Sequence, residues 1–350
     1  MGNKKRILIA PLDWGLGHAT RCIPIANAIE KSGNEVIFAS NGRALDLLMK
    51  EFPKNKFIKI PSYNITYSKY GGIGWILNMT LQIPKIISII KKENKALQNI
   101  IDDFKIDGVI SDNRFGMYSK KIPSVFITHQ INIKSPYFEK FIRNLNINYI
   151  SKFDECWIPD NNNRQLSGDL SIVKNKKITT KFIGPLSRFK KVEKKESLNI
   201  LGIISGPEPQ RTIFQNILVK QLKNKNAVLV LGKPEANKSE KIGDLKLISH
   251  LNTKELNQLI IDADIIISRS GYSTVMDLAV LDKNAIFIPT PGQTEQLYLA
   301  EYYYKNEIAF AMHQHEFDIE IALKKHQNFK GFKNLKNNIK LEELLTIFEE

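Results

Sequence analysis

The amino-acid sequence predicts an α/β protein made of two Rossmann-like domains with a cleft between them. Apolar, strand-like runs alternate with amphipathic runs of helix length along most of the chain, a pattern typical of parallel sheets whose strands are joined by helices. A polar, charged segment interrupts the pattern near the middle, as linkers do. The length of 350 residues suits about two domains on the usual size of ~150 residues each.

The first series of elements predicts an N-terminal domain over residues 1–186. A helix over Thr20–Lys31 joins the first two strands and ends just before Gly33, where a glycine commonly terminates a helix. The predicted strands of this domain are Arg6–Ala10, Glu35–Ala39, Gly108–Ser111, Ser124–Thr128 and Asp154–Ile158.

A second series follows a linker over residues 187–197 and predicts a C-terminal domain over residues 198–338. Residues 339–350 are expected to form a terminal helix. The predicted strands are Leu198–Ser205, Ala227–Leu231, Leu245–Ser249, Asp264–Ser268 and Ala285–Ile288. The predicted helices are Gln210–Lys223, Thr253–Asp262, Ser273–Leu281 and Glu295–Asn306.

Composition narrows the functional classes. Two cysteines are too few for a disulfide framework, and neither a signal peptide nor an uncharged run of ~20 residues is apparent, so we expect a cytoplasmic protein. Residues 1–187 carry 28 Lys and Arg against 15 Asp and Glu, which favours a polyanionic partner or reflects a Lys-rich composition. Aromatic residues are not interleaved with the basic ones, so we expect no nucleic acid partner.

Glycine-containing turns after strands predict ligand-binding loops, because the backbone can approach a ligand there and the next helix offers free N–H groups. The first loop carries Asp13, Gly17 and His18. It lacks the third glycine of a dinucleotide fingerprint, and a plain tight turn with a capping histidine is the alternative. The second loop carries Ser205, Gly206 and Arg211, and a turn that merely starts a helix is its alternative.

The third and fourth loops give the strongest pattern. One runs from Arg269 into a helix, with a glycine for the turn, hydroxyls near the positive helix end and a carboxylate one turn further on, as a diphosphate and a ribose would require. The other precedes the next helix with an acid–amide pair suited to sugar hydroxyls. The residues concerned are Arg269, Ser270, Gly271, Ser273, Thr274 and Asp277, then Gly292, Glu295 and Gln296.

These motifs resemble the family 28 glycosyltransferases of GT-B fold, which include the N-acetylglucosaminyltransferases of peptidoglycan synthesis. The resemblance implies a UDP-sugar donor whose diphosphate lies on the Ser270–Gly271 turn, with Asp277 at the ribose. It also implies that Glu295 and Gln296 contact the sugar and that backbone near Leu251 reads the uracil. It covers most of both domains and is more specific in the second.

Two positions depart from the family pattern. Arg21 stands where a proline is usual, and the Ser205–Arg211 loop has fewer glycines. The His18-x-x-Arg21-Cys22 spacing is also similar to the UDP-sugar hydrolase of pseudaminic acid synthesis, so hydrolysis of the donor is the alternative to transfer.

For transfer with inversion, a general base must deprotonate the acceptor while diphosphate leaves. We predict His18 as the base, with Asp13, Asp112 and His129 as alternatives. Helix N-termini, aided by Arg211 or Arg269, would stabilise the leaving group, so we expect neither a metal nor a cofactor.

The apolar segment 71–92, interrupted by Pro84 and closed by lysines, indicates contact with the inner face of an anionic membrane and hence a glycan or lipid-linked acceptor. A buried core helix or a dimer contact is the alternative.

Overall fold

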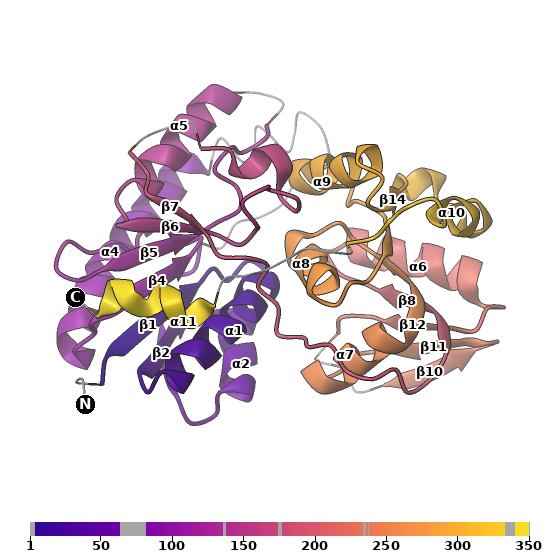
Figure 1. Ribbon diagram of the computed structural model, residues 1–350, viewed down its shortest axis with the longest axis horizontal. Helices are drawn as coiled ribbons and strands as arrows, with labels where there is room; N and C mark the ends of the chain where they lie inside the picture. The colour runs from indigo at the N-terminus through magenta and orange to yellow at the C-terminus, as the bar shows by residue number, and fades with distance from the viewer. Residues whose placement is uncertain are drawn as a thin grey trace. The chain divides into compact units, whose positions relative to one another are not determined.

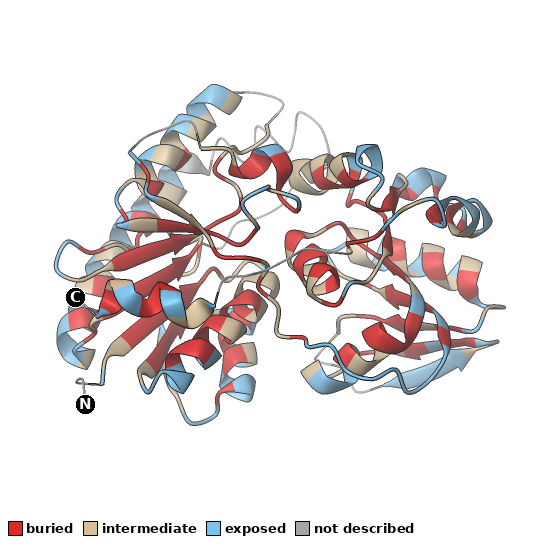
Figure 2. Ribbon diagram, in the orientation of Figure 1, coloured by how far each residue is buried: buried red, intermediate tan, exposed pale blue. Residues whose placement is uncertain are grey.

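The computed structural model describes residues 4–63, 82–135, 138–173, 177–233, 236, 238–332 and 340–349. The chain divides into two compact units: residues 1–187 together with 336–350, and residues 188–335. Among the described residues each unit contains one seven-stranded sheet, and Figure 2 shows the central strands of both sheets as mainly buried.

The first unit has the strand order β3-β2-β1-β4-β5-β6-β7, with every pair parallel. Helices α4 and α5 pack on one face, and α1 and the C-terminal α11 lie on the other (Figure 1). The strands are β1 (Arg6–Pro11), β2 (Glu35–Ser40), β3 (Lys56–Lys59), β4 (Gly108–Asp112), β5 (Ser124–Ile127), β6 (Glu155–Ile158) and β7 (Thr180–Phe182). The helical elements are α1 (Gly17–Lys31), α2 (Gly42–Glu51), α4 (Ile83–Phe104), α5 (Glu139–Ile150), η1 (Gly168–Ser171), α11 (Leu341–Leu344) and η3 (Leu345–Phe348).

The C-terminal helical turns return to the first sheet. The Phe348 ring lies where a Cβ on Gly108 would stand, 2.2 Å from its Cδ1 atom, and 6.5 Å from the Trp157 ring centroid. A glycine in β4 is therefore required for the last helical turn to pack against the sheet.

The second unit has the order β10-β11-β9-β8-β12-β13-β14, parallel except for the β10–β11 hairpin. Helices α6 and α10 pack on one face through a continuous apolar core, with α7 and α8 on the other (Figure 1). The strands are β8 (Leu198–Ile203), β9 (Ala227–Val230), β10 (Ser239–Ile242), β11 (Leu245–Ile248), β12 (Ala263–Ser268), β13 (Ala285–Phe287) and β14 (Phe310–Ala311). The helical elements are α6 (Gln210–Leu222), α7 (Thr253–Asp262), α8 (Tyr272–Val280), α9 (Thr294–Lys305), η2 (Gln314–Glu316) and α10 (Ile319–His326).

The α/β class and the two Rossmann-like domains are confirmed. The short edge strands β3, β10 and β14 escaped sequence analysis because two to four residues carry too little periodicity.

Of the apolar segment 71–92, residues 71–81 lie outside the described residues. The remainder belongs to α4, where Ile89 and Ile90 are buried against Leu12 and Tyr63. The described part of the segment is therefore an amphipathic helix that packs one face on the core and exposes Lys85, Lys91 and Lys92. No described helix combines the length and the apolarity needed to span a bilayer.

Candidate active site

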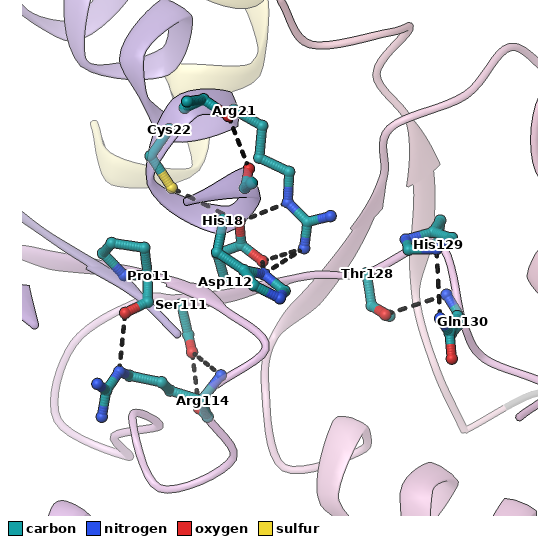
Figure 3. Close-up of polar contacts among 12 residues, drawn as sticks. Pro11, His18, Arg21, Cys22, Ser111, Asp112, Arg114, Thr128, His129 and Gln130 are labelled. Atoms are coloured by element: carbon teal, nitrogen blue, oxygen red, sulfur yellow. Dashed lines mark hydrogen bonds and ion pairs between the residues drawn. The ribbon is translucent and has the colours of Figure 1, made fainter. Parts of the chain in front are cut away.

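The predicted base, His18, is held by a buried carboxylate at the carboxyl end of the first sheet. Helix α1 begins at Gly17, so His18 lies in its first turn. Asp112 ends β4, directly beside the end of β1. His18 Nδ1 is 2.9 Å from Asp112 Oδ1. The imidazole side chain is 18% exposed whereas Asp112 is fully buried, so the carboxylate can orient the ring but cannot reach a substrate (Figure 3).

Arg21 completes this arrangement. Its Nε donates to Asp112 Oδ2 over 2.5 Å and its Nη2 contacts Oδ1, with the side chain 2% exposed. Burial alone would raise the pKa of Asp112, but the Arg21 guanidinium and His18 hold it at about 2. Burial also raises the pKa of the Cys22 thiol, whose sulfur lies 3.7 Å from Asp112. Asp112 is therefore an ionised, fully paired group.

The tautomer of His18 decides its chemistry. Nδ1 lies 2.9 Å from both Asp112 Oδ1 and Arg21 Nη2, so it either donates to the carboxylate or accepts from the guanidinium. Only the first arrangement leaves Nε2 with the lone pair that a general base needs. In that first arrangement Asp112 orients the ring, and its expected role as an alternative base is corrected because both of its oxygens are paired with Arg21 and His18.

Asp13 is anchored by a second buried cluster. Arg114 Nη2 donates to Asp13 over 3.1 Å, and Ser62 Oγ also donates to it. The fully buried Arg114 is paired in addition with Glu93 on α4, over 2.5 Å. The Asp13 carboxylate therefore ties the loop before α1 to the core, and its role as an alternative base stays a prediction.

His129 follows β5 and is 4% exposed. Its Nε2 lies 3.4 Å from the Gln130 amide nitrogen, and the two residues stand apart from His18 and Asp112 in Figure 3. The structure therefore brings together His18 and Asp112, but not His129.

In the second unit, the carboxyl ends of β8, β12 and β13 carry the predicted donor loops. Gly271 is the N-cap of α8, and no side chain caps this helix. Ser273 and Thr274 lie in its first turn and Asp277 one turn further on, all partly exposed. The first turn of α8 can thus present amides and hydroxyls to an anion.

Arg269 is turned into the protein. It is 1% exposed and its guanidinium donates to the Ile288 carbonyl at 2.9 Å, to the Gln210 carbonyl at 3.0 Å and to Gln314 Oε1 at 2.5 Å. The prediction that this cation contacts the diphosphate is corrected. Its N–H groups instead connect the segment after β13, the start of α6 and η2.

Arg211 is likewise engaged. Its Nη2 lies 2.7 Å from Glu208 Oε1 and its Nη1 donates to the Gly232 carbonyl at 3.1 Å. Hydrogen bonds from Thr212 and Arg211 lower the pKa of Glu208 despite partial desolvation, so this carboxylate is ionised. The Ser205–Arg211 loop therefore offers an anion a charge that is already paired, and the phosphate contact of Arg211 stays a prediction.

Gln296 organises the fourth loop. Its Oε1 accepts from the Thr290 N–H at 2.9 Å, its Nε2 donates to Gln293 at 2.5 Å, and its carbonyl accepts from Ser270 Oγ at 2.7 Å. These bonds leave one N–H of the partly exposed amide for a ligand, and the sugar contact of Gln296 stays a prediction. The adjacent Glu295 is partly exposed in the first turn of α9.

Three further predicted residues are partly exposed, and their expected contacts with the donor stay predictions. Ser205 and Leu251 are partly exposed, as is Gly292, which adopts a φ of 82°. Leu251 directly precedes Asn252, which caps α7 in a capping box with Glu255.

Sequence analysis missed the role of Arg21. The signal for it was its spacing of three residues from His18, which places both on one helix face. Within the described ranges, no three His, Cys, Asp or Glu side chains are grouped to hold a metal ion.

Comparison with known proteins defines the class. Residues 211–341 match the glycosyltransferase family 28 C-terminal domain. The chain is 28% identical, over 92% of its length and 88% of the relative's, to a Buchnera aphidicola protein named UDP-N-acetylglucosamine–N-acetylmuramyl-(pentapeptide) pyrophosphoryl-undecaprenol N-acetylglucosamine transferase. It is 24% identical to an uncharacterized glycosyltransferase of Methanosarcina acetivorans, over 83% of the chain and 81% of that protein.

Solved structures agree on the fold. The glycotransferase of kitacinnamycin superposes with a TM-score of 0.69 at 13% identity, covering 100% of this chain and 99% of that one. Acinetobacter baumannii MurG superposes with a TM-score of 0.61 at 14% identity, with 99% of each chain covered.

The protein is a glycosyltransferase with the GT-B fold, as the sequence predicted. Within that class it is family 28-like, and its second unit carries the domain that the family model describes.

Proposed function

We propose that this glycosyltransferase is an inverting, metal-independent enzyme that moves a sugar from a UDP-sugar to a glycan or lipid-linked acceptor. The second unit binds the donor and the first supplies the base. The names of its relatives, which specify an N-acetylglucosamine donor and an undecaprenol-linked acceptor, support an N-acetylhexosamine and a role in cell-envelope glycan synthesis.

The observation that carries the proposal is the His18–Asp112 contact of 2.9 Å. With Nδ1–H donating a hydrogen bond to Asp112, Nε2 of the partly exposed ring takes the proton of the acceptor hydroxyl as the sugar–phosphate bond breaks. The imidazolium that forms is stabilised by the ionised carboxylate, as in other histidine–carboxylate pairs. Arg21, which is bonded to both carboxylate oxygens, fixes the carboxylate in place.

The leaving diphosphate is stabilised by the first turn of α8, which lies at the positive end of the helix dipole. The hydroxyls of Ser273 and Thr274 lie in the same turn. Asp277 binds the ribose hydroxyls, and Glu295 the donor sugar.

The test is UDP release from a panel of UDP-sugars, with and without lipid-linked and soluble glycan acceptors, in the presence of EDTA. We expect release to depend on an acceptor, to persist without divalent metal and to give a product of inverted anomeric configuration by NMR. Equal rates without any acceptor would instead identify a UDP-sugar hydrolase, the alternative indicated by the His18–Arg21 spacing.

A second arm adds anionic lipid vesicles. If the enzyme works at the cytoplasmic face of a membrane, as its basic first half and its relatives' undecaprenol-linked acceptor suggest, vesicles containing the acceptor will raise the rate above that in detergent. An unchanged rate would contradict membrane contact while leaving the transferase assignment intact.

A further inference from the structure

The donor loops of the second unit have few groups left for an anion. The Arg269 guanidinium points inward, Arg211 is paired with Glu208, and the Ser270 hydroxyl donates to the Gln296 carbonyl. Whatever binds a diphosphate here must therefore use backbone amides and hydroxyls that the loops do not already consume.

The Thr290 hydroxyl is such a group. Thr290 follows β13 and is 1% exposed. Its Oγ1 has no hydrogen-bond partner among the described residues. A buried hydroxyl without a partner is unfavourable in the free protein, so its presence calls for an explanation beyond folding. Valine would fill the same volume without that cost.

Gly206 leaves space beside this hydroxyl. Gly206 is exposed, with a φ of 102° that side chains rarely adopt, and Thr290 Oγ1 lies 3.6 Å from the position that a Cβ would take. The turn after β8 therefore brings only backbone to the Thr290 hydroxyl, and the next two prolines of this loop, Pro207 and Pro209, have no N–H to offer it.

Thr290 is also tied to the start of α8. The Gln296 side chain accepts from the Thr290 N–H, and the Gln296 carbonyl accepts from the hydroxyl of Ser270, two residues before the first residue of α8. One residue therefore sets the position of Thr290 relative to the uncapped helix terminus. Gln296 therefore links the backbone of Thr290 to the residue that stands two before α8.

We propose that the Thr290 hydroxyl donates a hydrogen bond to a diphosphate oxygen of the nucleoside diphosphate sugar. Thr290 thus acts together with the first-turn amides of α8 in place of an arginine. This inference rests on the proposed function, since it assumes that the second unit binds the donor. The inference explains why the Thr290 hydroxyl is retained without a partner, although Arg211 and Arg269 are bonded to other groups.

The test compares Thr290→Val and Thr290→Ser with the wild type by titration calorimetry with UDP and by thermal melting without ligand. Hydrogen bonds to charged groups are strong, so we expect Thr290→Val to bind UDP about 10-fold or more weakly. Because the hydroxyl has no partner in the free protein, its melting temperature should be equal to or above that of the wild type. Thr290→Ser keeps the hydroxyl and should bind within about 3-fold of the wild type.

Each outcome decides the matter. Unchanged UDP affinity in Thr290→Val would overturn the inference, as would a loss in Thr290→Ser as large as that in Thr290→Val. A wild type that does not bind UDP would overturn the proposed donor as well, whereas wild-type binding with an unaffected valine variant would overturn the role of Thr290 alone.

Discussion

The two units treat buried charge in opposite ways. In the first unit, the buried Arg21–Asp112 pair lies directly behind a partly exposed histidine and prepares it for chemistry. In the second unit, Arg269 is equally buried, but its guanidinium donates to backbone carbonyls and to the Gln314 side chain. A buried cation near a ligand loop can therefore position a catalytic group or hold loops together, and its hydrogen-bond partners decide which.

The largest expected effect comes from the first unit. Replacing His18 with Ala removes the base, and we expect kcat for transfer to fall by about 10²- to 10⁴-fold, the usual contribution of general base catalysis. Initial rates of UDP release would measure this. The control is His315→Ala, a histidine whose side chain is 76% exposed. Full activity in His18→Ala would break the assigned role.

The next effect concerns the architecture of the second unit. Arg269→Met leaves the carbonyls of Ile288, Pro289 and Gln210 without their donors, and each buried unpaired group costs about 1–3 kcal/mol. We expect the free energy of unfolding to fall by at least about 2 kcal/mol in urea denaturation. Arg211→Met, at a residue with a more exposed partner, is the control and should cost much less. Equal losses would remove the distinction drawn between the two arginines.

The stability of the protein as a function of pH tests the lowered pKa of Asp112. Its pKa in the folded protein, about 2, lies below its ordinary value of 3.8, so its charged form stabilises the fold above pH ~4. That contribution, about 2 kcal/mol, is lost as the pH falls from about 4 toward 2. We expect Asp112→Asn to be less stable than the wild type at pH 7, and the difference to shrink over that range. A difference independent of pH would contradict the depressed pKa.

The smallest effect is expected at the second loop. Because Arg211 is already paired with Glu208, Arg211→Met should change UDP affinity by less than about 3-fold, as for other partly exposed ion pairs. Calorimetry with UDP would measure it. A loss of 10-fold or more would mean that Arg211 leaves Glu208 and binds the diphosphate. A cation of the second unit would then contribute directly to the reaction, as Arg21 does in the first.

Much of the fold could be predicted because the buried parallel strands are continuous apolar runs, such as Ala263–Ser268, which differs from its predicted start by one residue. His18 could be found because a glycine turn and a helix start follow a strand. The direction of a side chain could not be predicted: Arg269 and Arg211 both stand beside glycine turns in the sequence. Only packing shows that one faces carbonyls and the other Glu208.

The same limit applies to Thr290 and Gln296. In the sequence, a threonine between two prolines indicates an ordinary loop residue, and an acid–amide pair indicates a binding site for sugar hydroxyls. The tertiary contacts show the opposite. The Gln296 side chain makes hydrogen bonds within the loop, whereas the Thr290 hydroxyl makes none among the described residues.

The central claim is that donor binding belongs to the second unit and proton transfer to the first. Titrating UDP into His18→Ala and Asp277→Ala side by side tests it most directly. We expect His18→Ala to bind UDP with wild-type affinity. Asp277→Ala should bind UDP about 10-fold more weakly, because the ribose loses its carboxylate partner. Weakened binding in His18→Ala together with unchanged binding in Asp277→Ala would contradict the division.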